Sequence, residues 1–541
     1  MSEAFKKLCE DYLSTVWRLD PVRSTTIGIH HYDDLLTDYT PAAASEDLQA
    51  RHDLLSRCGG VDTSALTPEQ QIDLSLMLAD LKSAIAEHEL EVPRRAPYIY
   101  IDTIGRGLNV LIERNFASLE ERGTLLFKRL QAVPGFLKSA QNTLEPAVIP
   151  PIWMNIAISG ARGLGVFLAD TIKPFAEMTP LSADIIRVTQ NAQSALEEFQ
   201  AFLLRVEPDC KGIFAVGPDH FNSKLRDFQM VRMDAQDLHE FGQDQIAYYE
   251  KRLAEVARGM DESRTWVEII EEIKDNHPKA DELVSSYSHE MELAREFVED
   301  NDLVSIPRDA HCVVDWTPAY MQATVPLGVM YTTPPFEPGL NSKLLIKPVD
   351  SNAPPKEQRE HLRENNYAFQ RSIALHEVYP GHHLQRSYHK LSGSNVRKNF
   401  SAPIFVEGWG LYTEDLMHEA GYLSEPHLHL LQLKNALWRA VRVVIDTGLH
   451  TRGMSFDHAV ELLQNKVRME SHMAQGEVRR YTTHSNPTYP SSYLVGKTLI
   501  LKLREDYAKR QGNAFSLKSF HDRLLSYGSI PLQLIRQAML S

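Results

Sequence analysis

The stretch ALHEVYPGHHLQ, residues 374–385, decides which fold and chemistry the sequence predicts. It places His376 next to Glu377, the order found in zinc hydrolase helices of the HExxH type. In those helices two histidines one turn apart bind the metal, and the glutamate activates a water molecule. The position four residues after His376 is Pro380, which cannot bind a metal. The strict motif therefore fails, and the stretch is either a metal site with an insertion or a histidine-rich turn.

The Pro-Gly pair at 380–381 bears on how a second metal ligand could arise. In an unbroken helix His383 would lie about 10 Å along the axis from His376, too far for one ion. Proline removes a backbone donor and glycine permits unusual dihedral angles, so we expect the helix to kink or bulge here. Such a break could return either His382 or His383 to the neighbourhood of His376.

The stretch VEGWGLYTED, residues 406–415, supplies carboxylates. A catalytic zinc site commonly takes two histidines and one carboxylate. Glu407 and Glu414 lie two turns apart on one face of an expected helix, so one could bind a metal while the other orients a ligand histidine. An amphipathic helix with two solvated glutamates is the alternative. It explains poorly the two glycines of EGWG, each of which costs a helix up to about 1 kcal/mol, whereas close approach to a neighbouring helix or a substrate would explain them.

Helical periodicity dominates the rest of the chain. Apolar residues recur every three or four positions from the start to about residue 305. Between about 308 and 350 the segments are short, β-branched and bounded by prolines, which indicates strands. Further helices are expected at 357–379, 401–420, 424–450, 455–474, 491–510 and 515–538. We therefore predict a mainly α (α+β) fold with one small β-sheet beside the helix that carries the metal motif.

The length of the chain predicts two lobes, because 541 residues exceed what one hydrophobic core usually serves. We expect a helical N-terminal lobe over 1–305 and a catalytic lobe over 306–541, packed together as one integrated unit. The catalytic lobe would contain the small sheet (308–350), the metal helices (357–420) and the C-terminal helices (424–541).

Charge and composition restrict the partners. The net charge of -15 weighs against nucleic acid or an anionic membrane surface as the main partner. No stretch is expected to approach the ~20 apolar residues of a membrane span, and the start lacks the apolar core of a signal peptide. The four cysteines are far apart and form no CxxC pair, which fits a reducing cytoplasm. Nothing in the sequence fixes the oligomeric state.

Together, HEVYPGHHLQ and EGWGLYTE resemble the DUF885 family, which is grouped with the zincin-like metallopeptidases. EGWGLYTE is also similar to the glutamate helix EGxxxYxE of a class of zinc aminopeptidases, in which the first glutamate is the third zinc ligand. The resemblance extends over most of the chain, through DPVRSTTIGIHHYDDLL, FAVGPDHFNSKLR and EVRRYTTHSNPTYPSSYLVGK. It implies a zincin-like, two-lobed helical fold. Many relatives are exported lipoproteins, whereas no lipobox is recognised in this sequence.

The resemblance also implies a site. It assigns one zinc ion to this chain, with His376, His382 and Glu407 as its ligands and Glu377 as the general base. It favours His382 over His383 because the family motif fixes the histidine directly after Pro-Gly. His383 and Glu414 are then expected beside the metal ligands rather than among them.

The segment RRYTTHSNPTYPSSYLVGK, residues 479–497, offers further candidates. Relatives of this class add a tyrosine or histidine donor from a later helix, which stabilises the oxyanion. By its position in the family-like segment, Tyr493 is the first choice, and a core aromatic residue is the alternative. Arg479 and Tyr481 are candidates for holding a substrate carboxylate or carbonyl. His450 is a weaker substrate-binding candidate, because a histidine at a helix C-terminus commonly interacts with the helix dipole.

These observations predict a zinc-dependent hydrolase of peptide or amide bonds in small or unfolded substrates. One alternative is a non-haem Fe(II) enzyme that uses the same His/His/Glu set. The other is a non-catalytic binding protein on a zincin scaffold. The retained Glu377 disfavours both, because an oxygenase needs no base beside its first ligand and a degenerate site usually loses one of these residues.

Overall fold

The computed structural model describes residues 3–318, 322 and 327–541. The chain is mainly helical, at 72%, with one small three-stranded mixed sheet, as the sequence predicts. It divides into two compact units. Unit 1 comprises residues 1–216 together with 334–337 and 482–484, and unit 2 comprises the remainder. The boundary expected at residue 305 falls inside unit 2.

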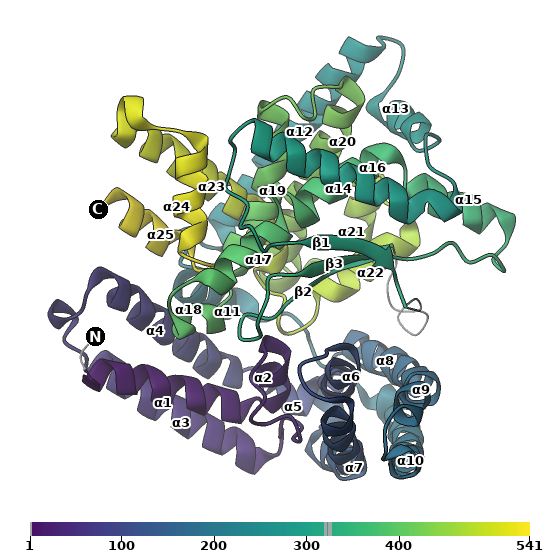
Figure 1. Cartoon of the computed structure of the whole chain (residues 1–541). Helices are drawn as coiled ribbons and strands as arrows, with labels where there is room; N and C mark the ends of the chain where they lie inside the picture. The colour runs from purple at the N-terminus through teal and green to yellow at the C-terminus, as the bar shows by residue number, and fades with distance from the viewer. Residues whose placement is uncertain (1–2, 319–321, 323–326) are drawn as a thin grey trace. The chain divides into compact units, whose positions relative to one another are not determined.

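Unit 1 is helical throughout (Figure 1). Its α-helices are α1 (Glu3–Leu19), α2 (Pro21–Ile27), α3 (Pro41–Gly59), α4 (Pro68–His88), α5 (Val92–Arg95), α6 (Tyr98–Glu113), α7 (Leu119–Thr143), α8 (Pro151–Asp170), α9 (Ile172–Glu177) and α10 (Ser182–Val206). Helices α6, α7, α8 and α10 enclose one continuous apolar core. Proline or a Ser/Thr/Asp cap begins most of these helices, as backbone geometry favours.

The run Pro151–Glu177, which contains α8 and α9, is long and apolar enough to cross a membrane by length and composition alone. This differs from the expectation that no stretch would approach a membrane span. One face of α8 contributes Trp153, Met154, Ala157 and Leu164 to the core of unit 1. Core helices of globular proteins reach the same apolar content, so the run is weak support for a membrane span.

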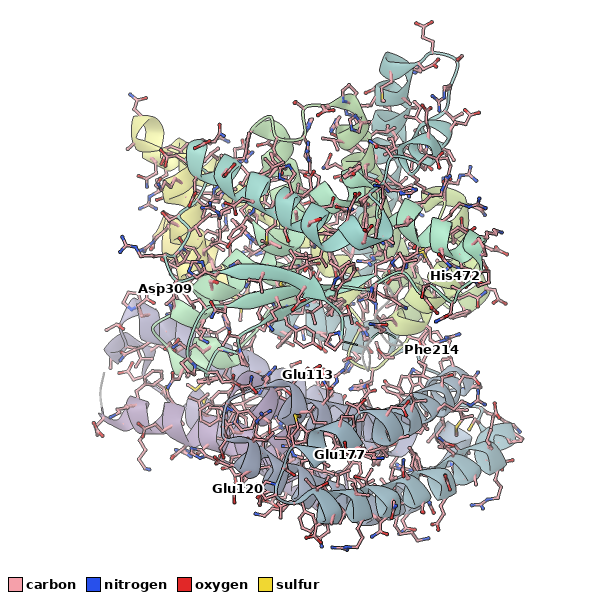
Figure 2. The ribbon with its side chains drawn as sticks, turned by 45° about the vertical axis from the view of Figure 1, so that its right-hand side comes forward. Glu113, Glu120, Glu177, Phe214, Asp309 and His472 are labelled. Carbon is pink, nitrogen blue, oxygen red and sulfur yellow. The ribbon has the colours of Figure 1, made fainter. Side chains whose placement is uncertain are left out.

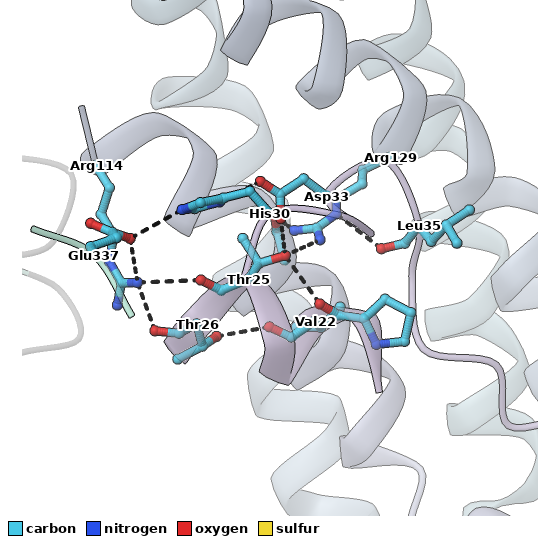
Figure 3. Close-up of polar contacts among 11 residues, drawn as sticks. Val22, Thr25, Thr26, His30, Asp33, Leu35, Arg114, Arg129 and Glu337 are labelled. Atoms are coloured by element: carbon cyan, nitrogen blue, oxygen red, sulfur yellow. Dashed lines mark hydrogen bonds and ion pairs between the residues drawn. The ribbon is translucent and has the colours of Figure 1, made fainter. Parts of the chain in front are cut away.

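A buried polar network fixes the segment that follows α2 (Figure 3). The fully buried guanidinium of Arg129 donates to the hydroxyl of Thr25 at 2.6 Å, and this hydroxyl lies 2.6 Å from Asp33. His30 pairs with Asp33 at 2.7 Å and approaches Glu337 at 3.5 Å. Burial lowers the pKa of His30, but these two carboxylates outweigh it and raise the pKa to about 9. The motif DPVRSTTIGIHHYDDLL therefore has a structural role in unit 1.

Some acidic side chains of unit 1 are exposed on its helices. Glu120, in the first turn of α7, and Glu177, at the end of α9, are exposed (Figure 2). The four cysteines are all free.

Unit 2 contains the sheet and the remaining helices. Before and within the sheet come α11 (Gly217–Ser223), α12 (Ala235–Met260), α13 (Trp266–Ile273), α14 (Leu283–Asp300), β1 (Cys312–Trp316), β2 (Gly328–Thr332) and β3 (Ser342–Ile346). After it come α15 (Pro355–Glu364), α16 (Tyr367–Ile373), α17 (His382–Leu391), α18 (Asn395–Asn399), α19 (Pro403–Glu419), α20 (Pro426–Thr451), α21 (Phe456–Leu462), α22 (Ser471–Tyr481), α23 (Tyr489–Gln511), α24 (Leu517–Ser526) and α25 (Leu532–Leu540). The strand order is β1-β3-β2, with β1 parallel and β2 antiparallel to β3.

Helices α19, α20 and α23 form the centre of unit 2 (Figure 1). Helices α19 and α20 are buried on almost every face, so their apolar residues do not follow a single stripe. The sequence predicts their bounds well. The expected helix 357–379 is instead interrupted after α15, and 515–538 is divided between α24 and α25 near Gly528, whose φ is +78°. The expected helix 455–474 is also interrupted. Helix α21 ends at Leu462 and is followed by the π-helical turn η8 (Leu463–Val467).

Candidate metal centre

The helix that carries His376 breaks within the PGHH stretch, as the sequence predicts. Helix α16 continues into a π-helical turn, η7 (Ala374–Val378), which carries His376 and Glu377. The Tyr379–Pro380 peptide bond is cis, and α17 begins afresh at His382. A Cβ atom at Gly381 would overlap the backbone carbonyl of His376, so only glycine permits this tight return. Irregular turns of this kind are frequent at functional sites.

The break brings His382 back beside His376. Their ring centroids are 4.9 Å apart and the ring planes are nearly perpendicular, at 88°. Ligand atoms of His376, Glu377 and His382 all lie within 4.8 Å of one another. Among the described residues, no other group of three His, Cys, Asp or Glu side chains lies close enough together to hold a metal ion. Both histidines are buried, so the group is preformed within the helical core.

His383 points to the sheet rather than to this group. Its Nδ1 lies 2.7 Å from the hydroxyl of Ser342 at the start of β3, and its ring packs edge-on against Tyr379 at 5.1 Å. Burial lowers the pKa of His383 to about 4, so this ring is neutral at neutral pH. The choice that the sequence leaves between the two histidines is therefore resolved in space, with His382 facing His376.

Helix α19 brings two carboxylates to the histidines from one face. An oxygen of Glu407 lies 3.6 Å from Nε2 of His382. Two turns later, Oε1 of Glu414 lies 2.8 Å from Nδ1 of His376. Nδ1 of His376 is thus engaged by a carboxylate, which leaves Nε2 of the ring as its donor atom toward a metal. Of the two glutamates, Glu414 is the one that contacts the His376 ring, and its role in orienting that ring stays a prediction.

The glycines of EGWG permit two close approaches. A Cβ atom on Gly410 would lie 2.8 Å from Cε1 of His376 and 3.0 Å from Cε1 of His382. A Cβ atom on Gly408 would lie 2.6 Å from the Cα of Gly496 on α23. Gly410 therefore makes room for the two imidazoles, and Gly408 for a helix crossing. Close approach explains both glycines, which the solvated-helix alternative left without a reason.

Two histidines together with Glu377 or Glu407 form a donor set that could hold a metal ion. Two imidazoles and a carboxylate are the ligands that catalytic zinc commonly takes, with one position left open. The buried Nδ1 of His382 has no hydrogen-bond partner among the described residues. Burial alone would raise the pKa of Glu407, but His382, the hydroxyl of Tyr489 and His376 lower it, so this carboxylate is ionised. Burial lowers the pKa of His376, but the carboxylates of Glu414 and Glu377 together raise it above the ordinary value of a histidine.

Two tyrosines of α23 extend the site. The hydroxyl of Tyr489 donates to Oε1 of Glu407 at 2.7 Å and lies 3.3 Å from the hydroxyl of Tyr493. Tyr493 therefore lies one hydroxyl contact away from Glu407, whereas Tyr489 contacts the carboxylate directly. The sequence contains a signal for this pair, because residues four apart on a helix share a face.

The cationic side of the site differs in detail from the expectation. Arg479 is exposed on α22, whereas its neighbour Arg480 lies 3.0 Å from Glu477. The buried Tyr481 hydroxyl also donates to Glu477. Arg442 of α20, which sequence reasoning missed, pairs with Glu477 at 2.8 Å. The available signal was the run LWRAVRVVI, in which two arginines three residues apart interrupt an apolar helix.

His450 lies in the last turn of α20, as expected, and is 1% exposed. Its Nε2 lies 3.0 Å from the backbone oxygen of Tyr481. Burial lowers the pKa of His450 to about 4. This contact joins the end of α20 to the end of α22 and favours a packing role over substrate binding.

Comparison with known proteins places the chain in a family. Solved structures with the same fold include "a putative lipoprotein of unknown function" from Shewanella oneidensis, 24% identical with a TM-score of 0.84, covering 99% of this chain and 100% of that one. Another is "the putative lipoprotein" from Colwellia psychrerythraea, 17% identical with a TM-score of 0.83, covering 99% of both chains. These descriptions give no support to the cytoplasmic location expected from the sequence. No curated protein matches. The model of DUF885, "Bacterial protein of unknown function", matches residues 21–539, and the chain therefore belongs to the DUF885 family.

Proposed function

We propose that this protein is a zinc-dependent hydrolase of peptide or amide bonds, built on a zincin-like scaffold. The observation that carries the proposal is the break in the helix at 379–381, which gathers His376, Glu377 and His382 within 4.8 Å. Glu407 adds the carboxylate of a His/His/Glu set, 3.6 Å from His382. An accidental cluster of histidines would not need Gly381 and Gly410 to clear space for it.

In this proposal His376, His382 and Glu407 would hold the ion, and Glu414 would orient His376. A bound zinc ion would polarise the scissile carbonyl and lower the pKa of water towards ~7. Glu377, adjacent to the first histidine and not part of the His/His/Glu set, would accept a proton from the attacking water. Glu377 would then deliver this proton to the nitrogen that leaves as the C–N bond breaks. Tyr493 or Tyr489 would donate a hydrogen bond to the oxygen of the former carbonyl.

The burial of the donor groups supports a preference for small or unfolded substrates. His376, His382 and Glu407 are at most 9% exposed. A short or unfolded chain reaches such buried groups more easily than the backbone of a folded protein does. Faster cleavage of a reduced, alkylated protein than of its native form is expected, and equal rates would contradict this preference.

The test combines metal analysis with one substitution. Protein purified without added metal is analysed for bound zinc and iron and then assayed on a peptide library. Glu377→Gln should retain the metal and lose at least about 10²-fold in turnover, because general-base catalysis is removed. Unchanged hydrolysis by Glu377→Gln would rule out this mechanism. Bound iron with oxygen consumption would instead indicate the non-haem alternative.

A further inference from the structure

Two guanidinium groups enter the core of unit 2 from α20, close to the candidate metal centre. Cζ of Arg439 and Cζ of Arg442 lie 4.5 and 4.1 Å from the ring centroid of Trp438. They lie 5.8 and 4.8 Å from the ring centroid of Tyr493. Cation–π contacts of this kind compensate only partly for burying a cation.

The carboxylate at this cluster is already shared. Glu477 pairs with Arg442 at 2.8 Å and with Arg480 at 3.0 Å, and it also accepts the hydroxyl hydrogen bond of Tyr481. Glu477 lies on α22. The single negative charge of Glu477 is thus already shared by two guanidinium groups and a phenol, none of which belongs to Arg439.

Arg439 has no carboxylate within ion-pair distance among the described residues. It is 9% exposed, its Nη1 donates to the backbone oxygen of Asn435 at 3.3 Å, and its buried Nε has no hydrogen-bond partner in the described part of the chain. Glu414 attracts Arg439 electrostatically, but its Oε1 contacts His376, and its buried Oε2 forms no hydrogen bond with Arg439 or with any other described residue. A planar, buried cation with free donors is costly unless an anion completes it.

Two tyrosines connect Arg439 to the candidate metal ligands. Its guanidinium faces the ring of Tyr493, whose hydroxyl lies 3.3 Å from that of Tyr489. Tyr489 in turn donates to Glu407 at 2.7 Å. An anion held by Arg439 would therefore lie on the tyrosine side of the candidate centre.

From this geometry we infer that Arg439 binds a carboxylate of the substrate. The inference rests on the proposed hydrolase function and specifies its substrate class: short peptides or amides with a carboxylate near the scissile bond. The guanidinium fork matches a carboxylate with two parallel hydrogen bonds, which a lysine cannot reproduce. The carboxylate is either the C-terminus of a short peptide or an acidic side chain beside the scissile bond.

Three matched probes distinguish these sources: benzoylglycylphenylalanine, its C-terminal amide, and the C-terminal amide of benzoylglycylglutamate. For the zinc-loaded protein, kcat/KM should be at least about tenfold higher for one carboxylate probe than for the neutral amide, since hydrogen bonds to charged groups contribute 1.5–3 kcal/mol. Arg439→Met should abolish this ratio and Arg439→Lys should reduce it. No preference in the wild type, or an equal loss on all probes in Arg439→Met, would overturn the inference.

Binding provides a readout independent of turnover. Calorimetry with zinc-loaded Glu377→Gln should show weaker binding of the favoured carboxylate probe when Arg439→Met is added, and no change when the exposed Arg187→Met is added instead. Metal content and the thermal unfolding midpoint verify that each variant is folded. If Arg439→Met does not fold, Arg439→Lys replaces it in the binding measurement. Arg439-dependent binding without hydrolysis would refute the proposed function and keep the subsite. Hydrolysis without carboxylate preference would keep the proposed function and refute the Arg439 subsite.

Discussion

Oε1 of Glu414 lies 2.8 Å from Nδ1 of His376, and both side chains are buried. This contact fixes the imidazole so that its other nitrogen faces His382, on the side where Gly410 leaves space. Metal-binding histidines commonly have such a carboxylate partner, which fixes the tautomer and orients the ring. The pair therefore links a residue of α19 to the geometry of the helix break.

Removing this partner should weaken metal binding without removing a ligand. We expect Glu414→Ala to lower zinc affinity by about 10–100-fold and Glu414→Gln to lower it less, since the amide oxygen still accepts the hydrogen bond. Competition with a chromophoric chelator measures the affinity. The exposed Glu461→Gln is the control and should bind zinc as the wild type does. Unaltered affinity in Glu414→Ala would show that the contact does not orient a ligand.

Alanine substitutions at the two glycines of EGWG should have different effects, one on metal binding and the other on stability. Gly410→Ala places a Cβ atom against both imidazoles, so we expect loss of most zinc binding. Gly408→Ala places it against the backbone of Gly496, so we expect global destabilisation of about 1–3 kcal/mol from overpacking. Metal content and urea unfolding are the two measurements. Gly476→Ala, a helical glycine with open space around it, should affect neither property adversely.

The sequence predicts the centre well where local rules apply. Pro380 and Gly381 cannot continue a regular helix, so a break is expected from these two residues. Glu407 and Glu414 must share a face if their segment is helical. The small sheet follows from its β-branched, proline-bounded segments. Each of these inferences depends on residues within about two helical turns of one another.

The remainder depends on contacts between distant segments, which one sequence does not contain. Tyr489 reaches Glu407 only because α23 crosses α19 at Gly408 and Gly496. Arg439 and Arg442 are visible as charges in an apolar helix, but their meeting with Tyr493 requires α20 to pack on α23. Unit 1 likewise includes two short segments from later in the chain, 334–337 and 482–484, that no compositional change marks.

The two tyrosines of α23 should differ in what their loss changes. Tyr489→Phe removes the donor to Oε1 of Glu407, so we expect weaker zinc binding. Tyr493→Phe leaves that donor in place. If Tyr493 donates to the developing oxyanion, kcat should fall by about 10²–10³-fold with zinc affinity retained. Zinc titration and steady-state kinetics on both variants separate these roles, and a larger fall in kcat for zinc-saturated Tyr489→Phe would assign the oxyanion contact to Tyr489.

Asp446 supports the start of the tyrosine-bearing helix and should make stability depend on pH. Its carboxyl group accepts hydrogen bonds from the Ser491 hydroxyl at 2.6 Å and from the backbone of Thr488 at 3.2 Å. Burial raises the pKa of Asp446 from 3.8 to about 7, although these hydrogen bonds lower it. The folded state therefore holds this proton more tightly than the unfolded state does. The corresponding stability is fully present below pH 3.8 and is lost as the pH rises from about 4 to about 7.

Substitution of Asp446 tests this dependence. Relative to Asp446→Asn, the wild type should lose up to ~1.4 kcal/mol of unfolding free energy per pH unit between about pH 4 and pH 7. Urea unfolding of both proteins at pH 5, 6 and 7 measures the difference, which cancels the titration of groups common to both. The exposed Asp457→Asn is the matched control and should run parallel to the wild type. If Asp446→Asn also runs parallel to the wild type, the carboxyl group is ionised in the fold, and the start of α23 is held by a charged rather than a neutral acceptor.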